Sequence, residues 1–177
     1  MPENAPYHLS VRRFKTSGFI KFIITCFSPI IDRILALNHL DKVYQKAKND
    51  SSCKYTFAAS ILKHLEADYH FDEKDLENIP KEGPIIISAN HPFGAVDGLI
   101  LSQIISKVRP DVKILANTGL SLIPEMNDYF IFTNPLKINN PKNVKSLKDC
   151  MKWLKDDHAL GLFPAGAVSH PQEDLGQ

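Results

Sequence analysis

The stretch PIIISANHPFGAVDGL, residues 84 to 99, contains the strongest structural signal in the chain. Ile85 to Ile87 form a β-branched apolar run, which is typical of a strand that is covered on both faces of a sheet. His91 follows this run after three polar or small residues, and Pro92 keeps the residues before it out of a regular helix. We therefore expect a buried strand that ends in an irregular turn carrying a histidine.

An aspartate lies six positions after the histidine. Residues six apart on one straight helix do not face each other, but a bend through residues 92–94 would bring Asp97 back towards His91. Gly94 and Gly98 suit such a bend, because glycine accepts positive φ and close backbone approach. A carboxylate beside one imidazole nitrogen fixes the tautomer and leaves the other nitrogen free as a base. The same pattern also fits a plain structural role, with Asp97 capping a helix and His91 in a loop.

Strands and helices alternate along the rest of the chain. Residues 85–88, 111–117, 129–133 and 159–163 are typical of strands, and residues 97–108 and the segment after Pro141 have helical apolar spacing. Upstream, Ser51-Ser52 marks the start of another helix, and residues 68–72 indicate a short strand. This alternation predicts an α/β fold with a mostly parallel sheet flanked by helices. Ligands gather beyond the carboxyl ends of such strands. We therefore expect His91, Asn117 and the turn 164–166 to meet at the carboxyl end of the sheet.

The helix after Pro141 has two distinct sides. Its apolar side, expected to be buried, consists of Val144, Leu147, Met151 and Leu154. A broad lysine-rich side consists of Lys142, Lys145, Lys148, Lys152 and Lys155. This side suits an acidic carrier protein or anionic lipid head groups, and it equally suits a solvated helix face.

The N-terminal residues 10–38 form an amphipathic pattern. Their apolar residues recur at helical spacing on one face: Phe19, Ile20, Ile23, Ile24, Phe27, Ile30, Ile31, Ile34 and Leu35. Pro29 is expected to kink or divide the helix. The apolar face could lie in a membrane interface or pack on the body of the domain. We expect residues 1–40 to form this segment and residues 41–177 the catalytic domain.

Composition excludes several other classes of protein. With 177 residues the chain suits one domain with a real core, and a net charge of +1 gives no field that would attract nucleic acid. Three widely spaced cysteines form neither a disulfide framework nor a metal clip. The histidines show no metal-ligand spacing. The N-terminal apolar run is too short for a membrane span and has no signal-peptide cleavage site.

Three blocks in order resemble the phospholipid/glycerol acyltransferase family, in its branch of hemolysin-related proteins and lyso-ornithine-lipid-type O-acyltransferases. The first block is IPKEGPIIISANHPFGAVDGLIL at 79–101, where five residues separate histidine and aspartate as in that branch. The second combines RPDVKILAN at 109–117 with IPEMNDYFI at 123–131, and the third is LGLFPAGAVS at 160–169. The similarity runs from about Ile34 to Ser169.

The resemblance implies a glycerolipid acyltransferase-like fold and an acyltransferase activity. His91 would be the general base for an acceptor hydroxyl and Asp97 would orient it, without a covalent acyl-enzyme. The donor would be a fatty acyl thioester of acyl carrier protein or coenzyme A, and no metal or cofactor would be required. The protein would sit peripherally on the cytoplasmic side of the inner membrane. The residues implied to line the substrate pocket are Asn90, Phe93, Gly94, Asn117, Phe163, Pro164, Ala165 and Gly166.

Departures from the family pattern bear on the acceptor. The segment DYFIFTNP at 128–135 lacks the arginine with which the glycerol-phosphate branches grip phosphate. This favours a lyso-amino-acid lipid of the ornithine or glycine type over a 1-acylglycerol-3-phosphate acceptor, which remains an alternative. Ala165 and Ala167 replace glutamates of the superfamily and of this branch, so either the acceptor site is altered or activity is reduced. We expect the family's C-terminal portion to be absent, and a truncated, inactive membrane-associated protein is a further alternative.

Overall fold

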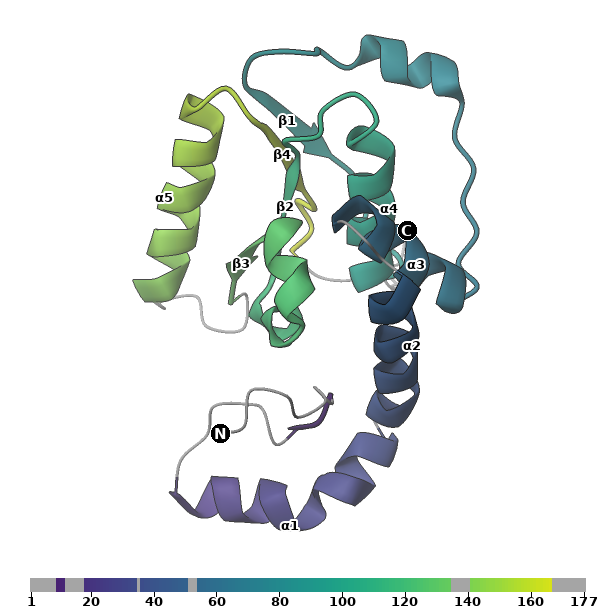
Figure 1. Cartoon of the computed structure of the whole chain (residues 1–177). Coiled ribbons are helices and arrows are strands. Elements are labelled where there is room, and N and C mark those ends of the chain that lie inside the picture. Colours follow the sequence, from purple (N-terminus) through teal and green to yellow (C-terminus); the bar gives the residue numbers. More distant parts are fainter. Residues whose placement is uncertain (1–8, 12–17, 35, 51–53, 135–140, 167–177) are drawn as a thin grey trace, which may run out of the picture.

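In the computed structural model of the chain, the residues described are 9–11, 18–34, 36–50, 54–134 and 141–166 (Figure 1). The helices are α1 (Gly18–Ile34), α2 (Leu37–Asp50), α3 (Lys54–His64), α4 (Ala95–Ile105) and α5 (Pro141–Lys155). The strands are β1 (Ile85–Ser88), β2 (Lys113–Asn117), β3 (Phe130–Thr133) and β4 (Ala159–Leu162). Short 3₁₀ helices connect them: η2 (Glu73–Asn78), η3 (Thr118–Leu122) and η4 (Pro124–Asp128).

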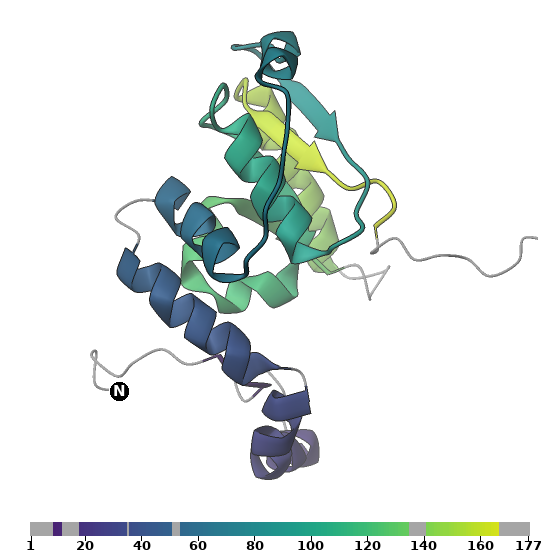
Figure 2. The ribbon, with the colours of Figure 1, turned by 90° about the vertical axis from the view of Figure 1, so that its right-hand side faces the viewer.

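The four strands form one parallel sheet in the order β1-β4-β2-β3. The last strand in the sequence, β4, therefore lies between β1 and β2. Helix α4 packs on one face of the sheet, with α3 packed against α4, and α5 covers the other face (Figures 1 and 2). The predicted α/β fold with a parallel, helix-flanked sheet is confirmed.

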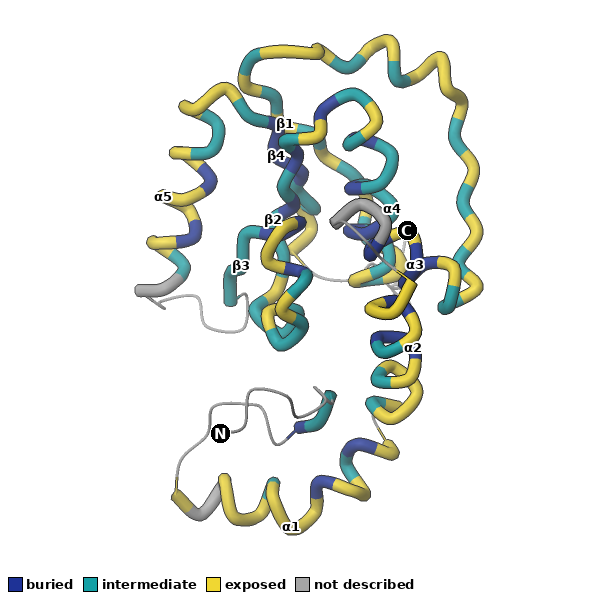
Figure 3. The backbone as a smooth tube through the Cα atoms, viewed as in Figure 1, coloured by how far each residue is buried: buried dark blue, intermediate teal, exposed yellow. Residues whose placement is uncertain are grey.

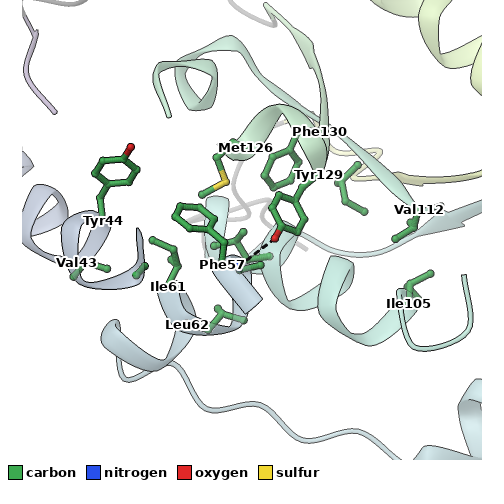
Figure 4. Close-up of a cluster of buried hydrophobic side chains, with 14 of the residues drawn as sticks. Val43, Tyr44, Phe57, Ile61, Leu62, Ile105, Val112, Met126, Tyr129 and Phe130 are labelled. Atoms are coloured by element: carbon green, nitrogen blue, oxygen red, sulfur yellow. Dashed lines mark hydrogen bonds between the residues drawn. The ribbon is translucent and has the colours of Figure 1, made fainter. Parts of the chain in front are cut away.

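The main core lies between the sheet and the helices α2, α3 and α4 (Figure 4). Tyr44 and Phe57 pack edge to face with ring centroids 6.2 Å apart. The backbone N–H of Ala58 donates to the Tyr129 hydroxyl at 3.4 Å, which ties α3 to the residue just before β3. Each large apolar side chain buried here contributes about 1.5–3 kcal/mol. This packing holds α4 against the sheet and thereby fixes the position of the turn before it.

Two sequence predictions about strands are wrong. The isoleucine run was expected to be covered on both faces, but β1 is an edge strand and Ile86 is 56% exposed. The residues at 68–72 form no strand. An isoleucine run has the same appearance whether its neighbours cover one face or two, because strand order depends on contacts with distant segments.

The apolar stripe expected to bury α5 is largely exposed. Val144, Leu147 and Met151 are 55%, 62% and 51% exposed, whereas Ser146 and Cys150 face the sheet and are buried. The hydroxyl of Ser146 donates to the backbone oxygen of Phe132 in β3. This hydrogen bond favours a rotation of the helix that an apolar pattern alone does not predict.

A buried ion pair closes the amino end of the sheet, opposite the turn that carries His91. Arg109 is 2% exposed and makes two hydrogen bonds to Asp111, of 2.9 and 2.8 Å. The same guanidinium donates to the backbone oxygens of Pro80 and Asp157. Asp111 also accepts from the backbone N–H of Ala159, the first residue of β4, at 2.9 Å. The pair therefore joins the segments that lead into β1, β2 and β4.

Helix α1 is exposed along most of its length (Figure 3). Among the side chains of α1 whose burial is described, Ser28 and Asp32 are buried. Asp32 accepts hydrogen bonds from the Ser10 hydroxyl and the Val11 N–H. The exposed apolar residues of α1 are Phe22, Ile23, Phe27, Ile30 and Ile34, from 39% to 76% exposed. The alternative in which this face packs on the body of the domain is therefore wrong for the part of the chain that the structure describes.

Pro29 does not divide α1, which continues to Ile34. The chain turns between α1 and α2, where Ala36 has a φ of 52°. Among the described helices, none is by itself long and apolar enough to cross a membrane. The segments Lys21–Ile34 and Leu37–Asp50 reach the required length and composition only as a pair, bent by 77°.

Candidate active site

The candidate site lies where β1 and β4 end side by side. Ser88 of β1 is in register with Leu162 of β4, and the N–H of Ala89 donates to the oxygen of Leu162 at 3.1 Å. The chains that leave these neighbouring strands therefore start from adjacent positions. One of them carries His91 and the other begins with Phe163.

The turn after β1 brings His91 and Asp97 together. Gly94 caps α4 with a φ of 65°, a conformation that glycine adopts readily, and the chain reverses into the helix there. Asp97 lies in the first turn of α4, and its Oδ2 is 3.1 Å from Nδ1 of His91. The predicted approach of the two side chains is present in the structure, whereas the catalytic role of each stays a prediction.

Asp97 has a structural role as well as its contact with the histidine. Its Oδ2 accepts a 2.8 Å hydrogen bond from the backbone N–H of Phe93, much as an acidic residue does in a capping box. The angle at His91 falls short of a hydrogen bond, so its buried Nδ1 has no hydrogen-bond partner among the described residues. Such contacts are often loosely aligned before substrate binds.

The ring of Phe163 stacks on the imidazole of His91. The two ring centroids are 4.2 Å apart and the planes are inclined by 21°. The resemblance implied that Phe163 lines a substrate pocket; the structure brings it directly against the histidine. Sequence reasoning did not find this contact, because it follows from β4 lying beside β1.

The remaining predicted pocket residues occupy two places. Asn90 and Phe93 lie in the turn after β1, and both are exposed. Pro164, Ala165 and Gly166 form an exposed turn after β4, in which the N–H of Gly166 donates to the oxygen of Phe163 at 3.0 Å. Both places border the ring pair of His91 and Phe163. Ala167 lies outside the described residues.

Asn117 is the last residue of β2 and lies at the carboxyl end of the sheet, as the candidate site does. Its side-chain oxygen accepts from the N–H of Gly119 at 2.9 Å and so caps η3. This local hydrogen bond accounts for an asparagine at the end of the strand without any ligand. A substrate-binding role for Asn117 therefore stays a prediction.

A hollow lies on the face of the sheet that α5 covers. Its lining comes from β2, β3, α5 and the residue that follows α5: Lys113, Phe130, Ile131, Phe132, Asp149, Lys152, Trp153 and Asp156. Neither His91 nor Asp97 lines it. Among the described residues, no group of three or more acidic, histidine or cysteine side chains is close enough together to hold a metal ion.

Comparison with known proteins gives a family match and two relatives. A family model described as Acyltransferase matches residues 70–176. A lyso-glycine lipid O-acyltransferase of Bacteroides thetaiotaomicron is 28% identical over 162 residues, which cover 88% of this chain and 53% of the relative. A protein of the same name from Phocaeicola vulgatus is 27% identical over 168 residues, covering 92% and 56%. The chain thus spans about half the length of the curated relatives it matches. No solved structure gives a significant match.

Proposed function

Because the chain belongs to the acyltransferase family, we propose that it moves a fatty acyl group from an acyl thioester to the hydroxyl of a lyso-lipid. The observation that carries this proposal is the contact between His91 and Asp97 at the carboxyl end of β1. A base held by a strand end and oriented by a carboxylate is what hydroxyl activation requires. The family match includes both residues.

In the proposed reaction, His91 accepts the proton of the acceptor hydroxyl. The oxygen then attacks the thioester carbonyl, and the tetrahedral intermediate collapses with loss of the thiolate. The imidazolium returns its proton to the departing sulfur, so the enzyme ends in its starting state. Asp97 beside Nδ1 keeps a proton on that nitrogen, which leaves Nε2 as the base. Direct transfer of this kind needs no acyl-enzyme, metal or cofactor.

For the acceptor we propose a lyso-amino-acid lipid, with the glycine type first. Two relatives that each cover most of this chain have the name lyso-glycine lipid O-acyltransferase. The absence of arginine from residues 128–135 speaks against an acceptor that is held by its phosphate. Acyl carrier protein and coenzyme A both remain candidate carriers of the acyl chain.

The test is acyl transfer by the purified chain. Labelled acyl thioesters of acyl carrier protein and of coenzyme A are incubated separately with lyso-glycine lipid, and the diacylated product is measured. Unlabelled lysophosphatidic acid is added as a competing acceptor. We expect labelled lyso-glycine product that the competitor does not suppress. Product only on lysophosphatidic acid would contradict the proposed acceptor, and the absence of product on either would favour the inactive membrane-associated alternative.

We further propose that the apolar face of α1 lies in the membrane interface, with the protein on the cytoplasmic side of the inner membrane. The support is the outward position of Phe22, Phe27 and Ile30, each more than half exposed. Exposed apolar side chains on one helix face partition into the boundary between head groups and acyl chains. Such a location would also place a lyso-lipid acceptor close to the protein.

Phe27→Glu is expected to weaken binding to vesicles of phosphatidylethanolamine and phosphatidylglycerol by about tenfold or more. The change removes a 54% exposed phenylalanine and adds a charge that would have to enter the interface. Asn38→Glu adds the same charge at an exposed position of α2 and serves as the control. Co-sedimentation measures both variants. Equal binding of wild type and Phe27→Glu would contradict membrane contact through this face.

A further inference from the structure

We propose that Phe163 is a positioning residue for His91. The ring of Phe163 holds the imidazole ring of His91 in the orientation that catalysis requires. The inference rests on the proposed function of the site and assigns Phe163 a different task from lining a substrate pocket. Its basis is the stacked pair of rings, 4.2 Å between centroids and inclined by 21°. Asp97 and Phe163 then act on the imidazole in complementary ways.

A single contact with a carboxylate does not fix an imidazole ring. Asp97 approaches Nδ1 at 3.1 Å without the angle of a hydrogen bond. That contact restrains the rotation of the ring about the bond to Cβ only weakly, because it fixes a distance and lacks the direction of a hydrogen bond. A flat neighbour against the ring face restrains the plane itself. Stacking by Phe163 therefore supplies the restraint that the carboxylate lacks, and it sets the direction in which Nε2 points.

The backbone of Phe163 is itself held rigidly. Leu162 before it is paired with Ser88 in the sheet, and its oxygen accepts from the N–H of Ala89. The oxygen of Phe163 accepts from the N–H of Gly166, which closes the following turn. The ring thus projects from a fixed strand end. His91 and Phe163 therefore follow the carboxyl ends of two strands that are paired in register at Ser88 and Leu162.

Gly98 provides the space behind the ring. A Cβ at this position would lie 3.9 Å from Cε2 of Phe163 and only 3.0 Å from Cε1 of Phe130. Phe130 is buried and has little freedom to move. A side chain at position 98 would therefore press on Phe130, whereas its distance to Phe163 is that of an ordinary van der Waals contact. Gly98, one residue after Asp97, thus lets α4 lie close to the ring of Phe130 in β3.

The first test measures the stacking directly by NMR in the histidine-labelled chain. An aromatic ring stacked on an imidazole shifts the carbon-bound imidazole protons upfield. The spectrum of His91→Gln identifies the His91 signals among the seven histidines. We expect Phe163→Leu to move these signals downfield and Phe163→Tyr to leave them near their wild-type positions. Phe71→Leu, which removes a ring away from the site, is the control and should leave them unchanged.

The second test separates positioning from substrate binding. We expect Phe163→Leu to lower kcat by about 10- to 100-fold, because small misplacements of a catalytic group have effects of this size. The KM values for thioester and lyso-lipid should change by less than threefold, and Phe163→Tyr should restore most of kcat. A pocket-lining residue would instead raise a KM and leave kcat largely intact.

Unchanged His91 signals in Phe163→Leu would overturn the inference whether or not the protein is active. A raised KM with kcat retained would also overturn it, in favour of a pocket role. If Phe163→Leu does not fold, nuclear Overhauser effects between the two rings of the wild type decide the matter, and their absence overturns the inference. Failure of the proposed function shows separately, as a lack of transfer by the wild type.

Discussion

His91→Gln lowers kcat for acyl transfer by about 10²- to 10⁴-fold, the usual contribution of a general base. Glutamine has a similar length and can form hydrogen bonds, but it cannot take the proton of the acceptor hydroxyl at neutral pH. The lyso-lipid and thioester should still bind, so their KM values should change little. The measurement is the initial rate of labelled product formation at saturating concentrations of both substrates.

The matched control is His70→Gln, which makes the same change at an exposed histidine outside the site. It should retain the wild-type rate. Asp97→Asn tests the partner, because asparagine preserves an oxygen for the Phe93 N–H but removes the negative charge beside Nδ1. It should lower kcat while both KM values persist. Turnover by His91→Gln equal to that of the wild type would end the assignment of His91 as the base.

The sequence predicted the strands of the sheet well, because each is a short apolar run bounded by turn residues. Parallel pairing followed from the alternation of strands with helices. The order β1-β4-β2-β3 did not follow, since nothing within β4 indicates that it inserts between two earlier strands. For the same reason Ile86 was expected to be buried, and it lies on an exposed edge.

The candidate site was predictable in part. The approach of Asp97 to His91 needed only a local turn, and the glycines that permit it are visible in the sequence. The stacking of Phe163 on His91 could not be predicted, because it joins positions 72 residues apart through the pairing of β1 with β4. Asn117 was predicted to bind substrate because it is a polar residue at a strand end. In the structure its side chain accepts a local hydrogen bond from the N–H of Gly119.

Asp111→Asn lowers the free energy of unfolding at pH 7 by about 3–5 kcal/mol, the usual effect of removing one partner of a buried ion pair. The change removes the carboxylate charge that directly contacts the guanidinium of Arg109, which is 2% exposed. It also weakens the acceptor for the N–H of Ala159 at the start of β4. Urea denaturation followed by circular dichroism measures the loss. The amino end of the sheet, rather than the candidate active site, is where one polar substitution should cost most stability.

The exposed pair Lys152–Asp156 provides a matched control. Its N–O distance of 2.7 Å is close to the 2.8 Å of the Arg109–Asp111 pair, but the lysine is 78% exposed and solvent screens the attraction. Asp156→Asn should therefore leave the free energy of unfolding within experimental error. If both variants lost the same free energy of unfolding, burial would not explain the contribution of the Arg109–Asp111 pair to stability.

The pH dependence of stability gives an independent check on Asp111. Burial is the largest single influence on this carboxyl and would raise its pKa, but the hydrogen bonds from Arg109 and Ala159, together with the charge of Arg109, outweigh it and lower the pKa to about 2. The unfolded chain has the ordinary value of 3.8, so the ionised carboxylate contributes its full stability above that value. The contribution, about 2 kcal/mol, is lost as the pH falls from about 4 towards 2. The difference in unfolding free energy between wild type and Asp111→Asn should accordingly shrink over this interval, and a difference that stays constant down to pH 2 would contradict the buried ion pair.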